Sequence, residues 1–176
     1  MSSYAVTGAS RGIGRAFLSN LSSNPSNTII ALVRNKAGTE KRVAEELSGR
    51  TNVQGQKPDC PRRKLRQIHL FNLFTPLILR GTAKKVIAIS SGHADFELVS
   101  KFNLATAPVY AISKVALNMA VPNSAPMTEE QRAVAAVIFT KFQEYAPTFT
   151  GARQPADSVK DMLDFIHNAT VEKNAG

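Results

Sequence analysis

The sequence predicts an α/β layered domain in which helices pack on a parallel β-sheet. Three observations support this. Short apolar segments at 3–7 and 28–33 alternate with amphipathic ones, three glycines follow the first apolar segment, and residues 28–33 (TIIALV) form one continuous apolar run. Such a run is typical of a strand covered on both faces in a parallel sheet. Alternation of strands with helices favours an α/β architecture.

The first part of the chain is predicted to form a βαβ unit. We expect a strand at 3–7, a helix at 15–22, a strand at 28–33 and a helix at 39–47. The turn-forming residues SSNPSN at 22–27 separate the first helix from the second strand. The three glycines therefore stand at the first strand-to-helix corner.

The rest of the chain is predicted to be mainly helical. The expected elements are a helix at 65–79, a third buried strand at 85–90 (KVIAIS), a helix at 110–121 and, after a proline-rich break at 122–126, two amphipathic helices at 128–145 and 156–168. The helix at 65–79 is apolar on most of its circumference, which indicates burial on two sides. Two interpretations explain this apolar character equally well. The helix is either a core helix in a monomer or the contact surface of a homo-oligomer, covered by a partner subunit.

Composition is that of an ordinary globular protein. The 176 residues are 43% hydrophobic and 20% charged, and we expect one domain spanning 1–176. The start of the chain lacks the features of a signal peptide, and no apolar run reaches membrane-spanning length. Cys60 is the only cysteine and cannot form an internal disulfide. These features predict a cytoplasmic protein without membrane contact.

The chain carries a net charge of +9, and part of it is concentrated at 57–66 (KPDCPRRKLR). A basic stretch of this kind can bind phosphate groups, which makes a basic binding module one functional alternative. The other interpretation is a solvated loop. No aromatic platform or recognition motif accompanies the stretch, so we favour the loop and expect no nucleic-acid partner.

Residues 7–14, TGASRGIG, form a glycine-rich turn leading into a helix. Backbone N–H groups at such a corner, together with the positive end of the helix, can receive a pyrophosphate. Taken alone the signal is weak, because glycine-rich turns are common. The candidate cofactor-binding residues here are Gly8, Ser10, Arg11, Gly12, Ile13 and Gly14.

A second group of polar residues has the spacing of a catalytic site. Tyr110 and Lys114 in YAISK lie four residues apart, on one face of the predicted helix. Ser91 stands at the carboxyl end of the predicted strand 85–90, where open α/β sheets bind ligands. Singly, these residues are explained as a half-buried tyrosine, a solvated lysine and a helix cap. In this order and together they predict a catalytic serine, tyrosine and lysine.

With these motifs the chain resembles the short-chain dehydrogenase/reductase family, and its segments at 23–47 and 68–79 look closest to fungal members. The resemblance implies a Rossmann-like doubly wound parallel sheet with helices on both faces. It also implies an oxidoreductase that interconverts a carbonyl and an alcohol on a small-molecule substrate. The resemblance also implies that Lys114 holds the nicotinamide ribose, besides its part in catalysis. It implies no metal.

These residue types suit that chemistry. Hydride transfer to a carbonyl leaves an alkoxide, which must receive a proton, and hydride chemistry belongs to the nicotinamide. A phenol is a poor acid at neutral pH, and a neighbouring ammonium stabilises its phenolate. Tyr110 would therefore be the proton donor, assisted by Lys114. The hydroxyl of Ser91 would polarise the substrate oxygen.

Two arginines predict a preference for NADP(H) over NAD(H). Members of such folds that use NAD place an acid after the second strand, where it holds the ribose 2′-hydroxyl. This chain has Arg34 at that place, and Arg11 lies in the glycine turn. Two guanidinium groups match the oxygens of a 2′-phosphate. Solvated surface arginines are the alternative.

The chain departs from the family pattern at two joins. Only 17 residues, 48–64, stand where the third and fourth strands are expected, and the sixth and seventh strands are not found after 121. No asparagine lies between Asn52 and Asn72, where a fourth catalytic group is expected. The sequence therefore predicts an internally deleted enzyme. A non-catalytic remnant or splice form that dimerises or binds is the alternative.

Overall fold

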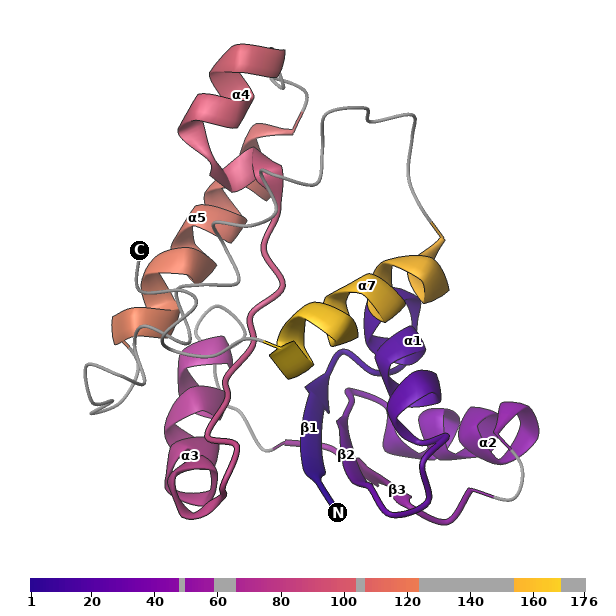
Figure 1. Ribbon diagram of the computed structural model, residues 1–176. Helices are drawn as coiled ribbons and strands as arrows, with labels where there is room; N and C mark the ends of the chain where they lie inside the picture. The colour runs from indigo at the N-terminus through magenta and orange to yellow at the C-terminus, as the bar shows by residue number, and fades with distance from the viewer. Residues whose placement is uncertain (48–49, 59–65, 104–106, 124–153, 169–176) are drawn as a thin grey trace. The chain divides into compact units, whose positions relative to one another are not determined.

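The computed structural model describes residues 1–47, 50–58, 66–103, 107–123 and 154–168 (Figure 1). By their contacts, the residues fall into two compact units. The first comprises Met1–Asp59 and Gly151–Phe165, and the second comprises Cys60–Thr150 and Ile166–Gly176. The single-domain organisation drawn from composition stays a prediction.

A three-stranded parallel sheet forms the centre of the first unit. Strands β1 (Ser3–Thr7), β2 (Thr28–Leu32) and β3 (Val53–Gln56) lie in the order β1-β2-β3. β1 pairs with β2 from Ser3↔Thr28 to Thr7↔Leu32. Helix α1 (Gly12–Leu21) contacts β1 and β2, and helix α2 (Lys36–Glu46) contacts β3. The predicted parallel βαβ unit is confirmed.

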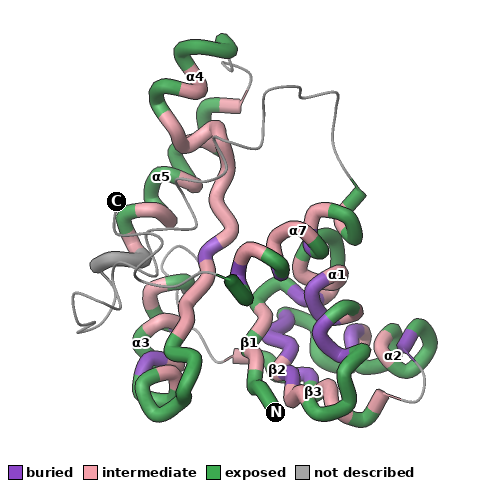
Figure 2. Tube along the Cα trace, viewed as in Figure 1, coloured by how far each residue is buried: buried purple, intermediate pink, exposed green. Residues whose placement is uncertain are grey.

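The core of this unit is built by α1 and β2, where buried positions gather in Figure 2. Leu18 of α1 and Ile29 of β2 have no exposed surface. Burying one such side chain contributes about 1.5–3 kcal/mol. Helix α7 (Pro155–Asn168) adds Val159 and Leu163 to the buried set. The continuous apolar run of β2 is therefore explained by burial, as the sequence predicts.

Strand β3 corrects the sequence analysis, which finds no third strand between 48 and 64. Val53–Gln56 pairs in parallel with β2. The pairing is extended by hydrogen bonds from Ile29 N to Asn52 O (2.9 Å) and from Val33 N to Gln56 O (2.9 Å). The four residues VQGQ contain one β-branched residue and no apolar alternation, so their sequence carries no strand signal. The strand forms because β2 offers a row of backbone partners.

The second correction concerns 85–90, which is not a strand in the structure. Helix α3 (Arg66–Arg80) leads into this segment, which runs as a single chain in Figure 1 to the short helix η2 (Gly92–Ala94). A strand needs a hydrogen-bonded neighbour, and the described residues supply none here. Helix α4 (Phe96–Phe102) and helix α5 (Pro108–Asn123) follow η2.

Other predictions have mixed outcomes. The helix at 65–79 matches α3, the helix at 110–121 lies within α5, and the helix at 156–168 lies within α7. The predicted helix at 128–145 and most of the basic stretch at 57–66 fall outside the described residues.

Among the described helices, none is long and apolar enough to cross a membrane. The described residues also contain no group of three or more acids, histidines or cysteines that could hold a metal ion.

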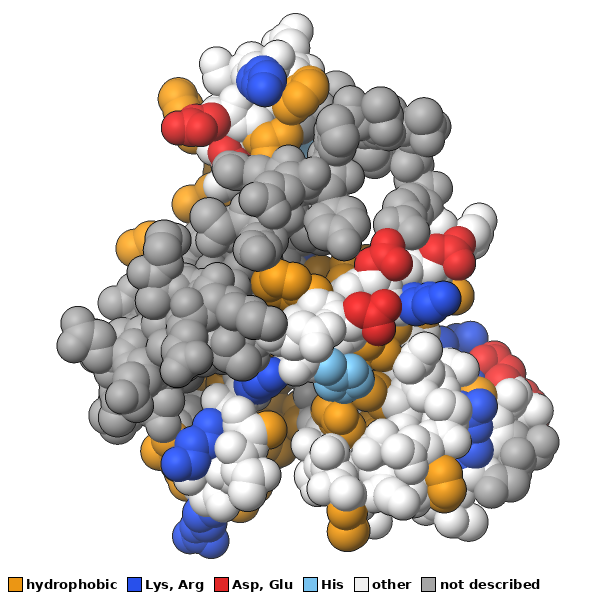
Figure 3. Space-filling model, viewed as in Figure 1, with side chains coloured by type: hydrophobic (Ala, Val, Ile, Leu, Met, Phe, Trp, Pro, Cys, Tyr) orange, Lys and Arg blue, Asp and Glu red, His pale blue; other side chains and the backbone are white. Residues whose placement is uncertain are grey.

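Charge is unevenly distributed over the described surface. Figure 3 shows acidic side chains gathered over α7, which carries Asp157, Asp161 and Asp164. The positive net charge of the chain is therefore offset locally on this helix.

Candidate active site

The glycine turn between β1 and α1 adopts left-handed backbone at two positions. Gly8 has a φ of +67° and Gly12 a φ of +57°. Side chains with a Cβ rarely adopt this conformation, so glycine is required at both. The backbone N–H of Gly8 donates to the carbonyl of Leu32 (3.1 Å), which ties the start of the turn to the end of β2.

Gly14 has a different role, because it lets α1 pack directly on the turn. A Cβ at Gly14 would lie 2.5 Å from the carbonyl oxygen of Gly8 and 3.1 Å from that of Thr7. The first distance is shorter than real Cβ contacts allow, and the second is tighter than most of them. The start of α1 therefore approaches the end of β1 and the turn too closely for a side chain at this position.

The start of α1 is suited to an anion. Its N-cap residue, Arg11, makes no side-chain cap hydrogen bond, and the first turn has no acidic residue. The first amide groups of a helix have no partner within the helix, and the helix dipole favours negative charge there. The turn and this helix end thus fit a pyrophosphate group, which the backbone N–H groups of Gly12 and Ile13 would hold.

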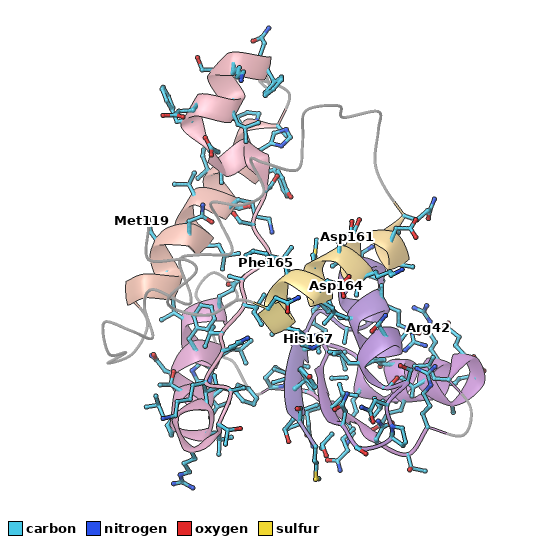
Figure 4. The ribbon with its side chains drawn as sticks, in the orientation of Figure 1. Arg42, Met119, Asp161, Asp164, Phe165 and His167 are labelled. Carbon is cyan, nitrogen blue, oxygen red and sulfur yellow. The ribbon has the colours of Figure 1, made fainter. Side chains whose placement is uncertain are left out.

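Side chains from α1 and α2 brace the same turn. Arg42, labelled in Figure 4, donates from Nη1 to the carbonyl oxygen of Ser10 (2.9 Å). Glu46 accepts from Arg15 Nη2 (2.6 Å) and from Arg42 Nε (3.1 Å). The hydrogen bond from Arg15, and to a smaller extent the one from Arg42, holds the pKa of Glu46 below its ordinary value of 4.5. The carboxylate therefore links both arginines beside the glycine turn.

Both arginines expected to recognise a 2′-phosphate are exposed. Arg34 follows the end of β2 by two residues, and Arg11 is the residue immediately before α1. The two segments carrying them are the loops at the carboxyl ends of β1 and β2. Ligands of open α/β sheets bind outside these ends.

The second unit contains the predicted catalytic serine. Ser91 is the N-cap of η2, and its Oγ accepts a hydrogen bond from the backbone N–H of His93 (3.3 Å). The Nδ1 atom of the His93 ring lies 3.4 Å from the same Oγ. Ser91 is therefore held at the end of the 85–90 segment, although that segment is not a strand.

Tyr110 and Lys114 lie together on α5, as their spacing predicts. The Nζ of Lys114 is 5.6 Å from the centroid of the Tyr110 ring, a cation–π distance. Lys114 Nζ also donates to the carbonyl oxygen of Ile89 (2.9 Å). The Tyr110 side chain is partly open to solvent, with 45% of the residue exposed. The structure therefore brings Tyr110 and Lys114 together, with the tyrosine partly open to solvent.

Sequence reasoning missed two residues of this cluster. His93 meets the Tyr110 ring edge-on, with centroids 5.7 Å apart and an interplanar angle of 78°. Asn118 of α5 accepts a hydrogen bond from Ser90 Oγ at its Oδ1 (2.5 Å). Asn118 follows Lys114 by one further helical turn, and His93 lies two residues after Ser91. Those offsets are the only sequence signal for either residue.

The candidate residues thus lie in two groups, one in each unit. The first unit holds the dinucleotide-type turn with Gly8, Ser10, Arg11, Gly12, Ile13, Gly14 and Arg34, and the second unit holds Ser91, Tyr110 and Lys114. The first group can hold an anion, and the second can donate hydrogen bonds.

Comparison with known proteins finds several fungal relatives. The short chain dehydrogenase virK of Hypocrea virens is 33% identical over the whole of this chain and 95% of its own length. The short-chain dehydrogenase/reductase AacuF of Aspergillus aculeatus is 32% identical over the whole chain and 96% of its own length. The protein iacC of Pestalotiopsis fici, of the same description, is 30% identical over 98% of this chain and 94% of its own length.

These matches span 258 residues each, whereas this chain has 176 in total. The relatives therefore carry internal segments that this chain lacks, as the two abrupt joins predict. No family model matches the chain.

Solved structures show the same type of fold. A carbonyl reductase from Pseudomonas aeruginosa superposes with a TM-score of 0.56 at 17% identity, covering 98% of this chain and 93% of its own. A short-chain dehydrogenase from Streptomyces avermitilis gives a TM-score of 0.53 at 16% identity, covering 97% of this chain and 85% of its own. The fold is a partial α/β fold of the Rossmann type.

Proposed function

Because this chain belongs to the short-chain dehydrogenase/reductase family, we propose that it is an NADP(H)-dependent oxidoreductase that interconverts a carbonyl and an alcohol. One observation carries the proposal: Ser91, Tyr110 and Lys114 cluster in the second unit with Lys114 Nζ 5.6 Å from the Tyr110 ring. The substrate is a small carbonyl compound or the corresponding alcohol.

The three residues have distinct roles in the proposed reaction. When bound, the nicotinamide supplies the hydride. Ser91 donates a hydrogen bond to the substrate oxygen and so stabilises the negative charge that develops on it. Tyr110 transfers its hydroxyl proton to that oxygen. Lys114 has two roles: its ammonium group stabilises the resulting phenolate, and it would also hold the nicotinamide ribose.

Consumption of NADPH by the purified chain, measured with a panel of aldehydes and ketones, tests this function. We expect slow turnover for two reasons. The 85–90 segment, which leads into Ser91, forms no strand of the sheet, and the asparagine expected between Asn52 and Asn72 is absent. Misplacement of a catalytic group by about 1 Å can lower the rate on the order of 100-fold. Absence of NADPH consumption across the panel would contradict the proposal.

A second candidate function is a non-catalytic relative that still binds the cofactor. The internal segments missing from this chain favour it, because the relatives have them. Calorimetric titration with NADPH separates the two functions when combined with the turnover assay. Binding without turnover identifies the non-catalytic protein.

The proposed preference for NADP(H) is tested at Arg34. Replacing Arg34 by Asp substitutes a carboxylate that repels the 2′-phosphate and accepts hydrogen bonds from a ribose 2′-hydroxyl. We expect the Kd for NADPH to rise at least about tenfold, as loss of one charge-assisted hydrogen bond implies, and the Kd for NADH to change little. Arg80→Asp, a basic residue at the end of α3, is the matched control. Equal losses for both cofactors, or a wild type that prefers NADH, would refute the assignment.

We further propose that a second copy of the chain covers α3. Leu73 and Leu77 of this helix are 54% and 58% exposed, which is unusual for two leucines one turn apart. Light scattering should give the mass of at least a dimer for the wild type and of a monomer for Leu73→Asp combined with Leu77→Asp. Phe96→Asp, at an exposed apolar position on α4, should keep the wild-type mass. A monomeric wild type would rule out this interface.

A further inference from the structure

An imidazole contacts two of the three candidate catalytic residues. The Nδ1 of His93 lies 3.4 Å from Ser91 Oγ, and its ring meets the Tyr110 ring edge-on. We propose that His93 is a positioning residue that directs the Ser91 hydroxyl hydrogen and orients the Tyr110 ring. This inference rests on the proposed carbonyl reduction, for which both residues must face the substrate oxygen.

The hydrogen bonds of Ser91 explain how His93 controls it. A hydroxyl has one hydrogen to donate and two lone pairs that accept. The backbone N–H of His93 occupies one lone pair of Ser91 Oγ. When Nδ1 of His93 carries no proton, it accepts the Ser91 hydroxyl hydrogen and competes with the substrate for it. When Nδ1 carries a proton, it donates to Oγ, and the hydroxyl hydrogen is left for the substrate.

Whether Nδ1 of His93 carries a hydrogen therefore sets which group the Ser91 hydroxyl donates to, and so whether Ser91 can polarise a carbonyl.

The Tyr110 ring is held from two directions. The His93 ring meets it edge-on at a centroid distance of 5.7 Å, and Lys114 Nζ lies 5.6 Å from its centroid. Aromatic pairs prefer this edge-to-face geometry. His93 therefore restrains the phenol while leaving its exposed side to a ligand.

Kinetics on two replacements of His93 test the proposal. His93→Asn keeps an amide that can donate a hydrogen bond near the position of Nδ1, whereas His93→Leu removes the donor. We expect His93→Leu to lower kcat about tenfold, the effect of one lost hydrogen bond in the transition state, with an unchanged KM for NADPH. His93→Asn should recover most of kcat. Equal losses of kcat in both variants, or a wild-type kcat in His93→Leu, would overturn the proposal.

His69 supplies the matched control. It is an exposed histidine on α3, and His69→Leu should keep the wild-type kcat. A loss of kcat in this variant equal to that in His93→Leu would show a general effect of removing a histidine and would overturn the role of His93.

A second measurement does not depend on turnover. The chain has three histidines, so nitrogen-15 imidazole signals can be assigned by single substitutions. Ser91→Ala should shift the tautomer ratio of His93 and leave that of His69 unchanged. An unchanged His93 signal overturns the positioning role, even if the chain consumes NADPH. A shifted His93 signal in a chain without NADPH consumption contradicts the proposed function and supports the contact.

Discussion

Replacing Tyr110 by Phe is expected to lower the kcat for carbonyl reduction by at least about 100-fold, the usual contribution of a general acid. The variant keeps the ring that meets His93 and Lys114 but lacks the hydroxyl that carries the proton. The alkoxide left by hydride transfer would then have to take its proton from water. Consumption of NADPH under single-turnover conditions measures the loss.

Two controls define what this loss means. Tyr4→Phe removes a hydroxyl from β1, in the other unit, and should leave kcat unchanged. Binding of NADPH to Tyr110→Phe should match the wild type, because the hydroxyl is not required to hold the pyrophosphate. A Tyr110→Phe variant with wild-type kcat would show that another group donates the proton.

Replacing Gly14 by Ala is expected to destabilise the first unit and to weaken cofactor binding. The added Cβ would lie 2.5 Å from Gly8 O and 2.8 Å from Gly8 C, both of them backbone atoms. Backbone cannot move aside as a flexible side chain can, so α1 or the turn must shift. Overpacking of this kind costs about 1–3 kcal/mol. Urea denaturation gives the loss in the free energy of unfolding, and titration gives the rise in the Kd for NADPH.

Gly92→Ala is the matched control for the stability measurement. A Cβ at Gly92 would meet only Leu98 Cδ1 at 3.7 Å, which is ordinary van der Waals contact. We expect its free energy of unfolding to stay within about 0.5 kcal/mol of the wild type, as for substitutions that create no clash. Equal losses at Gly14 and Gly92 would show that the packing of α1 on the turn is not the cause.

The two differences between the predicted and the observed strands have one physical origin. Residues 53–56 have no strand signal, yet they form β3 because β2 supplies hydrogen-bonding partners at the right register. Residues 85–90 have a strong strand signal, yet they form no strand, and α5 holds them instead through Lys114 and Asn118. The pattern of side chains along the chain indicates which residues are buried. A strand also requires a neighbouring strand to bond to, and no local pattern specifies that neighbour.

The sequence by itself determined the features that depend on residues near one another in the chain. The left-handed turn at Gly8 and Gly12 and the Tyr110–Lys114 pair follow from local backbone preference and helical spacing. Only the tertiary structure decided the features that depend on distant segments. The parallel pairing of β2 with β3, and the contact of the His93 ring with Tyr110 on α5, join residues far apart in the chain, and their energy comes from packing and pairing that exist only once the chain has folded.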